Sequence, residues 1–203
     1  KGTPLKSVNQ YYNKQIAKCR SICELMNGRH SSKRIARLTA KRNRKIVDYL
    51  HKASCKVIDL CAEQDVSVLV VGKNKGWKQE VNLGRKVNQS FVQLPFARFI
   101  QMLQYKAESI GMKVVLTEES YTSGTSFLDG EVPTKDHYDK SRRVYRGLFQ
   151  ANDGRKINAD VNGAYQIMRK VFPNVNANGI EGVALRPAVV ALSMSARRSS
   201  GCA

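Results

Sequence analysis

The segment VSVLVVG, residues 66–72, is a short continuous apolar run that is rich in valine and ends in glycine. A run of this length and composition is typical of a strand buried in a parallel sheet. The segment MKVVLTE, residues 112–118, repeats the pattern, and residues 91–110 between the two runs place apolar side chains at helical spacing. Strand, helix and strand in this order predict a βαβ unit with parallel strands, and therefore an α/β fold.

Helices are also expected before this unit. The first covers residues 5–26 and stops at Gly28, and the second covers residues 31–63 with Ser31 or Ser32 as its cap. In the helix between the two strands, six apolar positions are expected to face inward: Phe96, Phe99, Ile100, Leu103, Ala107 and Ile110. Helices therefore flank the predicted sheet.

Positive charge dominates the composition. The 203 residues include 35 Lys and Arg against 16 Asp and Glu, which gives a formal net charge of +19. A surplus of this size on a short chain indicates a polyanionic partner, with nucleic acid as the leading candidate.

The cations concentrate in the first half of the predicted helix 31–63, in the segment KRIARLTAKRNRK. Six of them recur at three- and four-residue intervals: Lys33, Arg34, Arg37, Lys41, Arg44 and Lys45. On a helix they form a cationic ridge, which is either a solvated face or a phosphate-binding face. No acid interrupts the run before Asp48, and this favours phosphate contact.

The loop after the first strand carries the only tryptophan of the chain. Trp77 lies among Lys73, Lys75 and Lys78. The ring either covers the edge of the core or stacks on a base of a bound nucleic acid.

Two acids, Glu118 and Glu119, come at the end of the second predicted strand. Open α/β folds place their sites at this edge of the sheet. Asp160 lies near the start of a last predicted helix, which begins at residue 157, and it serves there either as a cap or as a ligand. Carboxylates that converge from different elements suit a catalytic Mg²⁺. The alternative for the two glutamates is ordinary strand-end chemistry.

The five cysteines are odd in number and contain no C-x-x-C pair, and no apolar stretch is long enough to cross a bilayer. We therefore expect neither a disulfide framework nor a membrane association. We expect a cytoplasmic location.

Three segments resemble the C-terminal half of TnpB, the RNA-guided DNA nuclease of insertion sequences. They are VLVVGKNKGWKQ, YKAESIGMKVVLTEESYTS and KINADVNGAYQI. Proteins of this family are also described as OrfB-type transposases and are related to the type V CRISPR effectors. The likeness covers roughly residues 1–174 and is carried best by Y-T-S combined with D-V-N.

The resemblance implies a RuvC-like domain of RNase H fold, in which three carboxylates and two Mg²⁺ ions hydrolyse target DNA chosen by a guide RNA. The last carboxylate of the family stands in D-V-N, here Asp160. The middle one normally ends the first of the two strands, where this chain has Gly72 and Lys73. Glu119 or Glu118, with Glu119 preferred, is expected to replace it, because neighbouring parallel strands end about 5 Å apart. We expect that glutamate and Asp160 to have carboxyl oxygens within roughly 4 to 7 Å of each other.

Most relatives also insert a zinc ribbon before the last helix. In this chain the ligand positions hold Ser126, Asp129, Gln150 and Asp153. Zinc requires thiolate or imidazole for a stable structural site, so we expect a degenerate ribbon-like hairpin that binds no zinc. Arg146 in the same region is expected to bind nucleic acid or, like Lys73, to neutralise the acids.

The first carboxylate of the family would precede Lys1. We therefore expect the C-terminal part of a longer protein, which is inactive without its N-terminal remainder. The expected domain layout is a RuvC-like domain at 1–121, an insertion at 122–156, a last RuvC-like helix at 157–174 and a tail at 175–203 with little order beyond Arg197.

The function implied is that of a transposon-encoded, RNA-guided, Mg²⁺-dependent DNA endonuclease. One alternative is a nuclease-inactive, RNA-guided DNA-binding protein or a pseudogene fragment. Another is a basic RNA-binding protein. Asp160 separates the first two, because an inactive protein should tolerate its loss without a change in DNA binding.

Overall fold

The computed structural model describes residues 2–74 and 94–177, together with residues 187, 190 and 192. The described chain divides into two compact units. The first holds residues 2–66 and 94–111 with 190 and 192, and the second holds residues 67–74, 112–177 and 187. Strands β1 and β2 belong to the second unit, while the helix between them in sequence belongs to the first.

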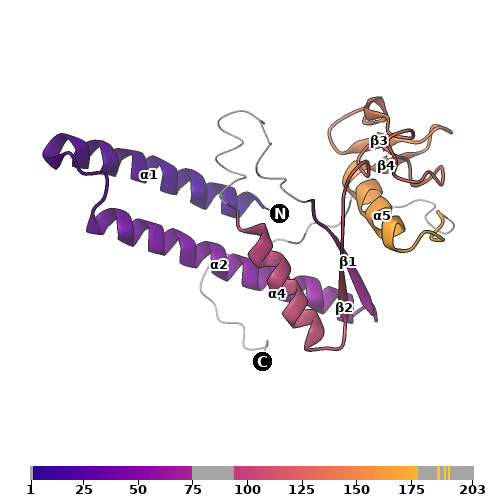
Figure 1. The fold of residues 1–203 in the computed structure, drawn as a ribbon, viewed down its shortest axis with the longest axis horizontal. Helices are drawn as coiled ribbons and strands as arrows, with labels where there is room; N and C mark the ends of the chain where they lie inside the picture. Colours follow the sequence, from indigo (N-terminus) through magenta and orange to yellow (C-terminus); the bar gives the residue numbers. More distant parts are fainter. Residues whose placement is uncertain (1, 75–93, 178–186, 188–189, 191, 193–203) are drawn as a thin grey trace. The chain divides into compact units, whose positions relative to one another are not determined.

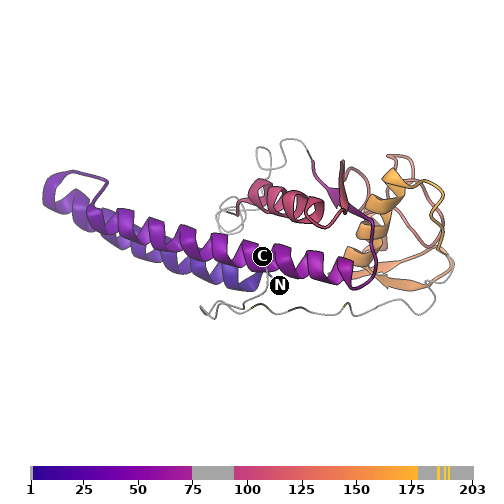
Figure 2. The ribbon, with the colours of Figure 1, turned by 90° about the horizontal axis from the view of Figure 1, so that it is seen from below.

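The first unit begins with a pair of long helices, α1 (Thr3–Asn27) and α2 (Lys33–Ala62), which run antiparallel beside each other (Figures 1 and 2). Gly28 ends α1 with φ of 61°, a left-handed conformation that glycine adopts without steric cost. The side chain of Ser32 caps α2 by accepting a hydrogen bond from the amide of Ile35 at 3.3 Å. Both helices match the sequence prediction to within two residues.

Helix α4 (Phe96–Glu108) packs against α2. The prediction that this helix already covers residues 94 and 95 is wrong, because Pro95 disfavours the helical conformation at the residue before it. Ile110 is 52% exposed rather than inward-facing, since α4 ends at Glu108. Met102, at 4% exposure, is buried instead.

The core of the first unit lies between these three helices. Its buried members are Leu5, Ile46, Tyr49, Leu50, Leu94 and Met102. They come from α1, α2, α4 and the segment leading into α4, so the packing of one face of each helix holds the unit together.

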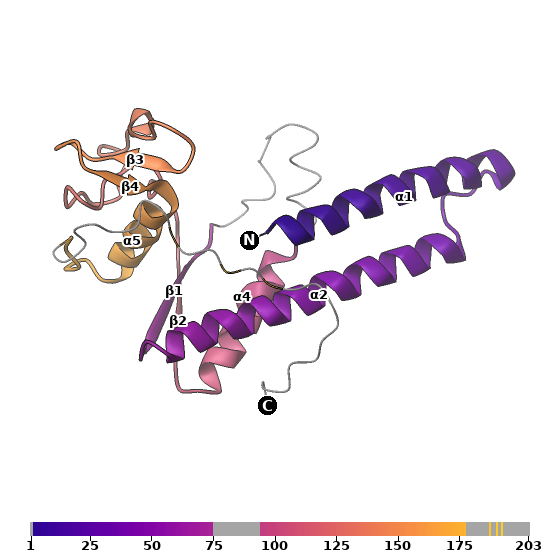
Figure 3. The same cartoon turned by 180° about the vertical axis from the view of Figure 1, so that it is seen from behind.

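The second unit contains a pair of parallel strands, β1 (Val68–Gly72) and β2 (Lys113–Thr117), drawn side by side in Figures 1 and 3. The register places Gly72 opposite Thr117 at the C-terminal ends. The predicted α/β fold with parallel strands is confirmed. The prediction that both strands are buried is wrong, because every residue of β1 is only half-buried and Leu116 on β2 is 38% exposed.

The rest of the second unit is a small antiparallel pair and a helix. Strands β3 (Leu148–Gln150) and β4 (Lys156–Asn158) pair antiparallel, and α5 (Ala159–Val171) follows β4 directly. The predicted start of the last helix at residue 157 is therefore wrong by two residues. Ile157 pairs with Phe149 across the two strands and both side chains are buried, so tertiary packing holds residue 157 in the strand.

Within the described residues no helix is long and apolar enough to cross a membrane. Most of the predicted tail, including all of it beyond Arg197, lies outside the described residues.

Candidate functional site

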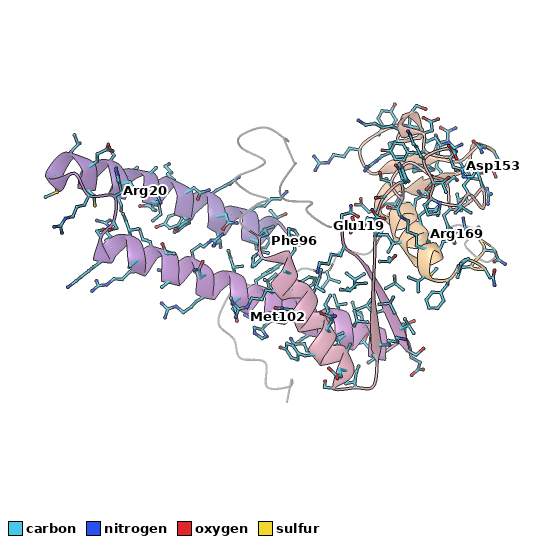
Figure 4. All side chains as sticks on the ribbon, in the orientation of Figure 1. Arg20, Phe96, Met102, Glu119, Asp153 and Arg169 are labelled. Atoms are coloured by element: carbon cyan, nitrogen blue, oxygen red, sulfur yellow. The ribbon has the colours of Figure 1, made fainter. Side chains whose placement is uncertain are left out.

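Glu119 lies at the C-terminal ends of the paired strands β1 and β2, where Figure 4 labels it. Its side chain lies directly over Gly72. A Cβ atom built on Gly72 would be 2.6 Å from the Glu119 Oε1 and 2.8 Å from its Cδ. The carboxyl group thus occupies the space into which a side chain at position 72 would extend, and only glycine at that position leaves room for it.

Two contacts fix the backbone around Glu119. Its amide donates to the Asn74 Oδ1 at 2.7 Å, and the amide of Lys73 donates to the carbonyl oxygen of Thr117 at 2.7 Å. The residues after β1 and after β2 are therefore tied to each other. The backbone at Glu119 is therefore fixed, and a fixed backbone helps to keep a metal ligand in position.

The two neighbouring glutamates differ in what their carboxylates contact. Glu118 is exposed, and its Oε1 accepts a hydrogen bond from the Ser120 hydroxyl at 2.6 Å. Glu119 is half-buried, and its carboxylate has no hydrogen bond or ion pair among the described residues. Glu119 is therefore the better candidate ligand.

Asp160 stands in the first turn of α5, which contacts both β1 and β2. The capping role considered for it belongs to Asn158, whose Oδ1 accepts from the amides of Asp160 at 2.9 Å and of Val161 at 3.2 Å. In the described part of the chain the exposed Asp160 carboxylate forms no hydrogen bond or ion pair. Its side chain is therefore available for an external ligand.

The chemistry of Glu119 and Asp160 suits a hard divalent cation, since carboxylates without protein partners are the ligands that Mg²⁺ takes. Among the described residues no group of three or more Asp, Glu, His or Cys side chains could hold a metal ion. Glu119 and Asp160 therefore do not form a full ligand set with any third side chain that the structure describes. The close approach of Glu119 and Asp160 stays a prediction.

Neutralisation of the acids by cations was the structural alternative. Lys73 and Arg146 are both exposed, and neither forms an ion pair with Glu118, Glu119 or Asp160 among the residues that the structure describes. The alternative therefore has no support from contacts.

The insertion is held by a charged network, which composition and spacing did not predict. Arg142 Nη1 donates to both carboxylate oxygens of Glu131, at 2.9 and 2.7 Å, and the side chains are only 18% and 13% exposed. The Glu131 Oε2 also accepts from the amide of Ser126 at 2.8 Å. Glu131 thereby links three parts of the insertion, as a structural metal would. The two residues lie eleven positions apart in turn-rich sequence, so no periodic signal marks them.

Three of the four positions at which the resemblance places zinc ligands make hydrogen bonds within the insertion. Ser126 Oγ accepts from the Asp129 amide at 3.3 Å, and Asp129 Oδ2 accepts from the Asn152 amide at 2.9 Å. Asp153 Oδ1 accepts from the Arg155 amide at 2.9 Å. These oxygens serve the turns of the insertion and do not offer the soft ligands that zinc prefers.

Buried polar side chains connect the insertion to α5, the helix that carries Asp160. Asn162 accepts from the amide of Phe127 at 3.0 Å, and Arg169, labelled in Figure 4, donates to the carbonyl of Glu131 at 2.9 Å. The Arg169 guanidinium also lies 4.2 Å from the ring centroid of Phe127, and burial lowers the pKa of this group. The insertion thus fixes the rotation of α5 and with it the direction of Asp160.

The predicted basic ridge is an exposed face of α2 in the first unit. All six residues are exposed: Lys33, Arg34, Arg37, Lys41, Arg44 and Lys45. None of the six forms an ion pair within the described ranges 2–74 and 94–177. Arg42 instead turns to α1 and donates to the Asn9 Oδ1 at 2.8 Å. The face is free to contact phosphates. The predictions for Lys75, Trp77 and Lys78 lie outside the described residues.

Comparison with known proteins gives two family matches. Residues 1–78 match the OrfB_IS605 family, described as a probable transposase, and residues 96–167 match the TNB domain of the Cas12f1-like family.

Two relatives cover most of the chain. A CRISPR-associated endodeoxyribonuclease, Cas12f2, from a Micrarchaeota archaeon is 24% identical over 180 residues, which is 84% of this chain and 31% of the relative. The TnpB-like protein ORF457 of Acidianus two-tailed virus is 24% identical over 179 residues, which is 84% of this chain and 36% of the relative. The chain therefore spans about a third of the length of these relatives.

The fold is similar to a chain in the cryo-EM structure of a Cas12f1–sgRNA–target DNA complex. The TM-score is 0.52 at 20% identity, over 77% of this chain and 40% of that one. The two family matches and the two relatives are all TnpB-like or Cas12f-like proteins, and the solved structure shows that the fold is similar. The family matches and the relatives support a likeness to the TnpB/OrfB family.

Proposed function

We propose that this chain is the C-terminal part of an RNA-guided DNA endonuclease whose RuvC-like site uses Glu119 and Asp160 as two of its carboxylates. The observation that carries the proposal is the Glu119 carboxyl group over Gly72. The family places an acid at the end of that strand, and here a residue from the neighbouring strand supplies one at the same place.

The free carboxylates give the proposal chemical support. Glu119 and Asp160 would hold a divalent cation, because both lack protein partners among the described residues while most acids around them are bonded. A bound Mg²⁺ supplies an activated water and charge stabilisation at the leaving oxygen of a phosphodiester. The third carboxylate of the family's set would come from outside this chain, which spans about a third of the length of its relatives.

Other residues of the chain would hold Glu119 and Asp160 in position. Asn74 fixes the backbone of Glu119, and Asn158 caps α5 so that Asp160 stays in its first turn. The hydrogen bond from Arg169 to the carbonyl oxygen of Glu131 would keep α5 from rotating about its own axis. We assign the insertion at 122–156 to a degenerate zinc ribbon in which the Glu131–Arg142 pair replaces the metal, and residues 1–121 and 157–174 to the RuvC-like domain.

The basic face of α2 would bind the guide RNA or the target strand. Twelve Lys and Arg and a single acid, Glu24, occur between residues 3 and 45. A helix pair with this charge attracts a phosphate backbone of any sequence, so it contributes affinity and leaves sequence choice to base pairing.

The second candidate is a nuclease-inactive, RNA-guided DNA-binding protein. The Gly72–Lys73 pair favours it, because the family's usual acid is absent from the first strand. The two candidates differ in one respect: the nuclease needs Glu119 and Asp160 for cleavage, whereas the inactive protein needs neither for DNA binding.

The test is DNA cleavage in Mg²⁺ by the guide-bound full-length protein, which includes the proposed N-terminal remainder, with DNA binding measured in parallel. Glu119→Gln and Asp160→Asn should each lower the cleavage rate by at least about 100-fold and leave DNA binding unchanged, since both remove a metal ligand. Glu118→Gln is the matched control and should cleave like the wild type. Full cleavage by Glu119→Gln, or equal losses for Glu118→Gln and Glu119→Gln, would overturn the assignment. A wild-type protein that binds DNA and does not cleave it would support the second candidate.

A further inference from the structure

The turn that follows Glu119 contains a strained tyrosine. Tyr121 has φ of 66°, in the left-handed region that bulky side chains rarely adopt. Among the described residues only Asp65 shares a positive φ without being glycine. Backbone strain of this kind persists where the surroundings enforce it and concentrates at functional sites.

Two threonines enforce the strained conformation. The amide and hydroxyl of Thr122 both donate to the carbonyl oxygen of Glu119, at 3.2 and 2.8 Å. The hydroxyl of Thr125 donates to the carbonyl oxygen of Tyr121 at 3.0 Å. Thr122 and Thr125 are buried, at 5% and 0% exposure, so the hydrogen bonds that hold the turn are shielded from water.

The strain turns a large ring outward and is not needed to fill the core. Tyr121 is 42% exposed, and the ring of Tyr138, which is 39% exposed, meets it edge-on at 5.9 Å between centroids and 71° between planes. Neither ring is a member of the buried cluster formed by Phe149, Ile157 and Ala159. An enforced, solvent-facing aromatic pair has the character of a binding surface.

A second glycine makes room for this pair. A Cβ atom on Gly124 would lie 2.5 Å from the Tyr138 Cε2 and 2.7 Å from its Cδ2. The amide of Asp139 donates to the carbonyl oxygen of Gly124 at 3.0 Å, which holds the Tyr138 segment against the turn. The close approach of Tyr138 therefore depends on glycine at position 124.

Cations accompany the aromatic rings. Between residues 138 and 146, Tyr138 and the 72%-exposed Tyr145 alternate with three exposed cations: Lys140, Arg143 and Arg146. These three form no ion pair among the described residues, in contrast to Arg142, which is committed to Glu131. The one exposed acid within this stretch, Asp139, already accepts from Ser141 at 2.8 and 2.6 Å. Exposed aromatics interleaved with free cations are what a single-stranded nucleic acid binds.

We propose that Tyr121 and Tyr138 form a stacking platform that positions an unpaired base of a single DNA strand beside the Glu119 carboxylate. Tyr121 lies two residues after Glu119, so their Cα atoms are within about 7 Å of each other, close to one nucleotide step. Stacking on the ring pair holds the strand, and the cations of 140–146 contact its phosphates. The proposal rests on the function proposed above for its substrate and adds the residues that hold that substrate.

The test measures base stacking apart from charge. The affinity of the chain for a dT oligonucleotide is compared with its affinity for an abasic oligonucleotide of the same length, in EDTA so that neither metal binding nor cleavage contributes. The wild type should prefer the dT strand, because a stacked base is worth about 5- to 150-fold in affinity. Tyr121→Gly and Tyr138→Ala should each lower this preference by about 5-fold or more, and Tyr121→Phe should keep it. Tyr105→Ala is the control, since Tyr105 is an exposed tyrosine of the first unit.

Tyr121→Gly also separates a binding role from a structural one. Glycine adopts a φ near +60° without strain, so this variant should unfold at the same temperature as the wild type or above it while it loses the preference for dT. An unchanged preference in Tyr121→Gly, or a loss seen only with an RNA strand, would overturn the proposal. Both outcomes leave the cleavage test of Glu119 and Asp160 unaffected.

Discussion

Replacing Glu131 with alanine should destabilise the second unit more than any exposed acid of the insertion would. The change removes the partner of Arg142 from a pair in which both side chains are less than a fifth exposed, and it leaves the amide of Ser126 without an acceptor. Breaking a buried pair from one side costs about 3–5 kcal/mol. Arg142 keeps its 2.8 Å hydrogen bond to the Asn152 Oδ1, so we expect the lower end, about 3 kcal/mol.

For a unit of this size, a loss of about 3 kcal/mol lowers the midpoint of thermal unfolding by roughly 12–24 °C. The assay is thermal unfolding followed by circular dichroism, with hydrogen exchange at the β3–β4 pair to assign the transition to this unit. Asp153→Ala is the matched control. It breaks an ion pair between side chains that are 46% and 49% exposed and should leave the midpoint nearly unchanged.

The same experiment tests what replaces the metal. In buffer without Mg²⁺, EDTA should not shift the wild-type midpoint, because the Glu131–Arg142 pair and its hydrogen bonds hold the insertion. A shift with EDTA, stoichiometric zinc in the purified protein, or equal midpoints for Glu131→Ala and Asp153→Ala would refute the reasoning.

Three further predictions address pH, the strand-end glycine and the basic face. Burial and the nearby cation Lys106 lower the pKa of His51 below its ordinary 6.5. The contribution of His51 to the stability of the first unit should therefore be fully present above pH 6.5 and be lost as the pH falls through the lowered value, and His51→Gln should flatten that dependence in urea titrations. Gly72→Ala should displace the flexible Glu119 side chain and abolish cleavage with little change in unfolding temperature, whereas retained cleavage would contradict the contact. Arg37→Gln should reduce the slope of log affinity for nucleic acid against log salt by about 0.7–0.9, and an unchanged slope would remove this residue from the interface.

The helices and the parallel strand pair were predictable because each depends on local signals. Ser32 caps α2 and Gly28 ends α1 as the sequence indicates. The errors arise where a distant contact or a proline decides the boundary. Helix α4 begins only after Pro95, and the pairing of Ile157 with Phe149 keeps residue 157 in a strand.

The candidate site was predictable only in its residue types. The sequence predicts that Glu119 lies at a strand end. Only the structure shows its side chain over Gly72, because these two residues lie 47 positions apart in the sequence. The Glu131–Arg142 pair and the strained conformation of Tyr121 left no sequence signal. Both arise from how the turns of the insertion fold onto each other, and no local rule of spacing encodes that.

The measurement that tests the account most directly is anomalous X-ray diffraction from crystals of this chain soaked in Mn²⁺, a substitute for Mg²⁺ that can be located by its own scattering. We expect one Mn²⁺ ion with carboxylate oxygens of both Glu119 and Asp160 at about 2 Å from it. The peak should vanish in crystals of Glu119→Gln and persist in crystals of Glu118→Gln. An ion bound away from these residues, or Glu119 and Asp160 carboxylates too far apart to share it, would contradict the account.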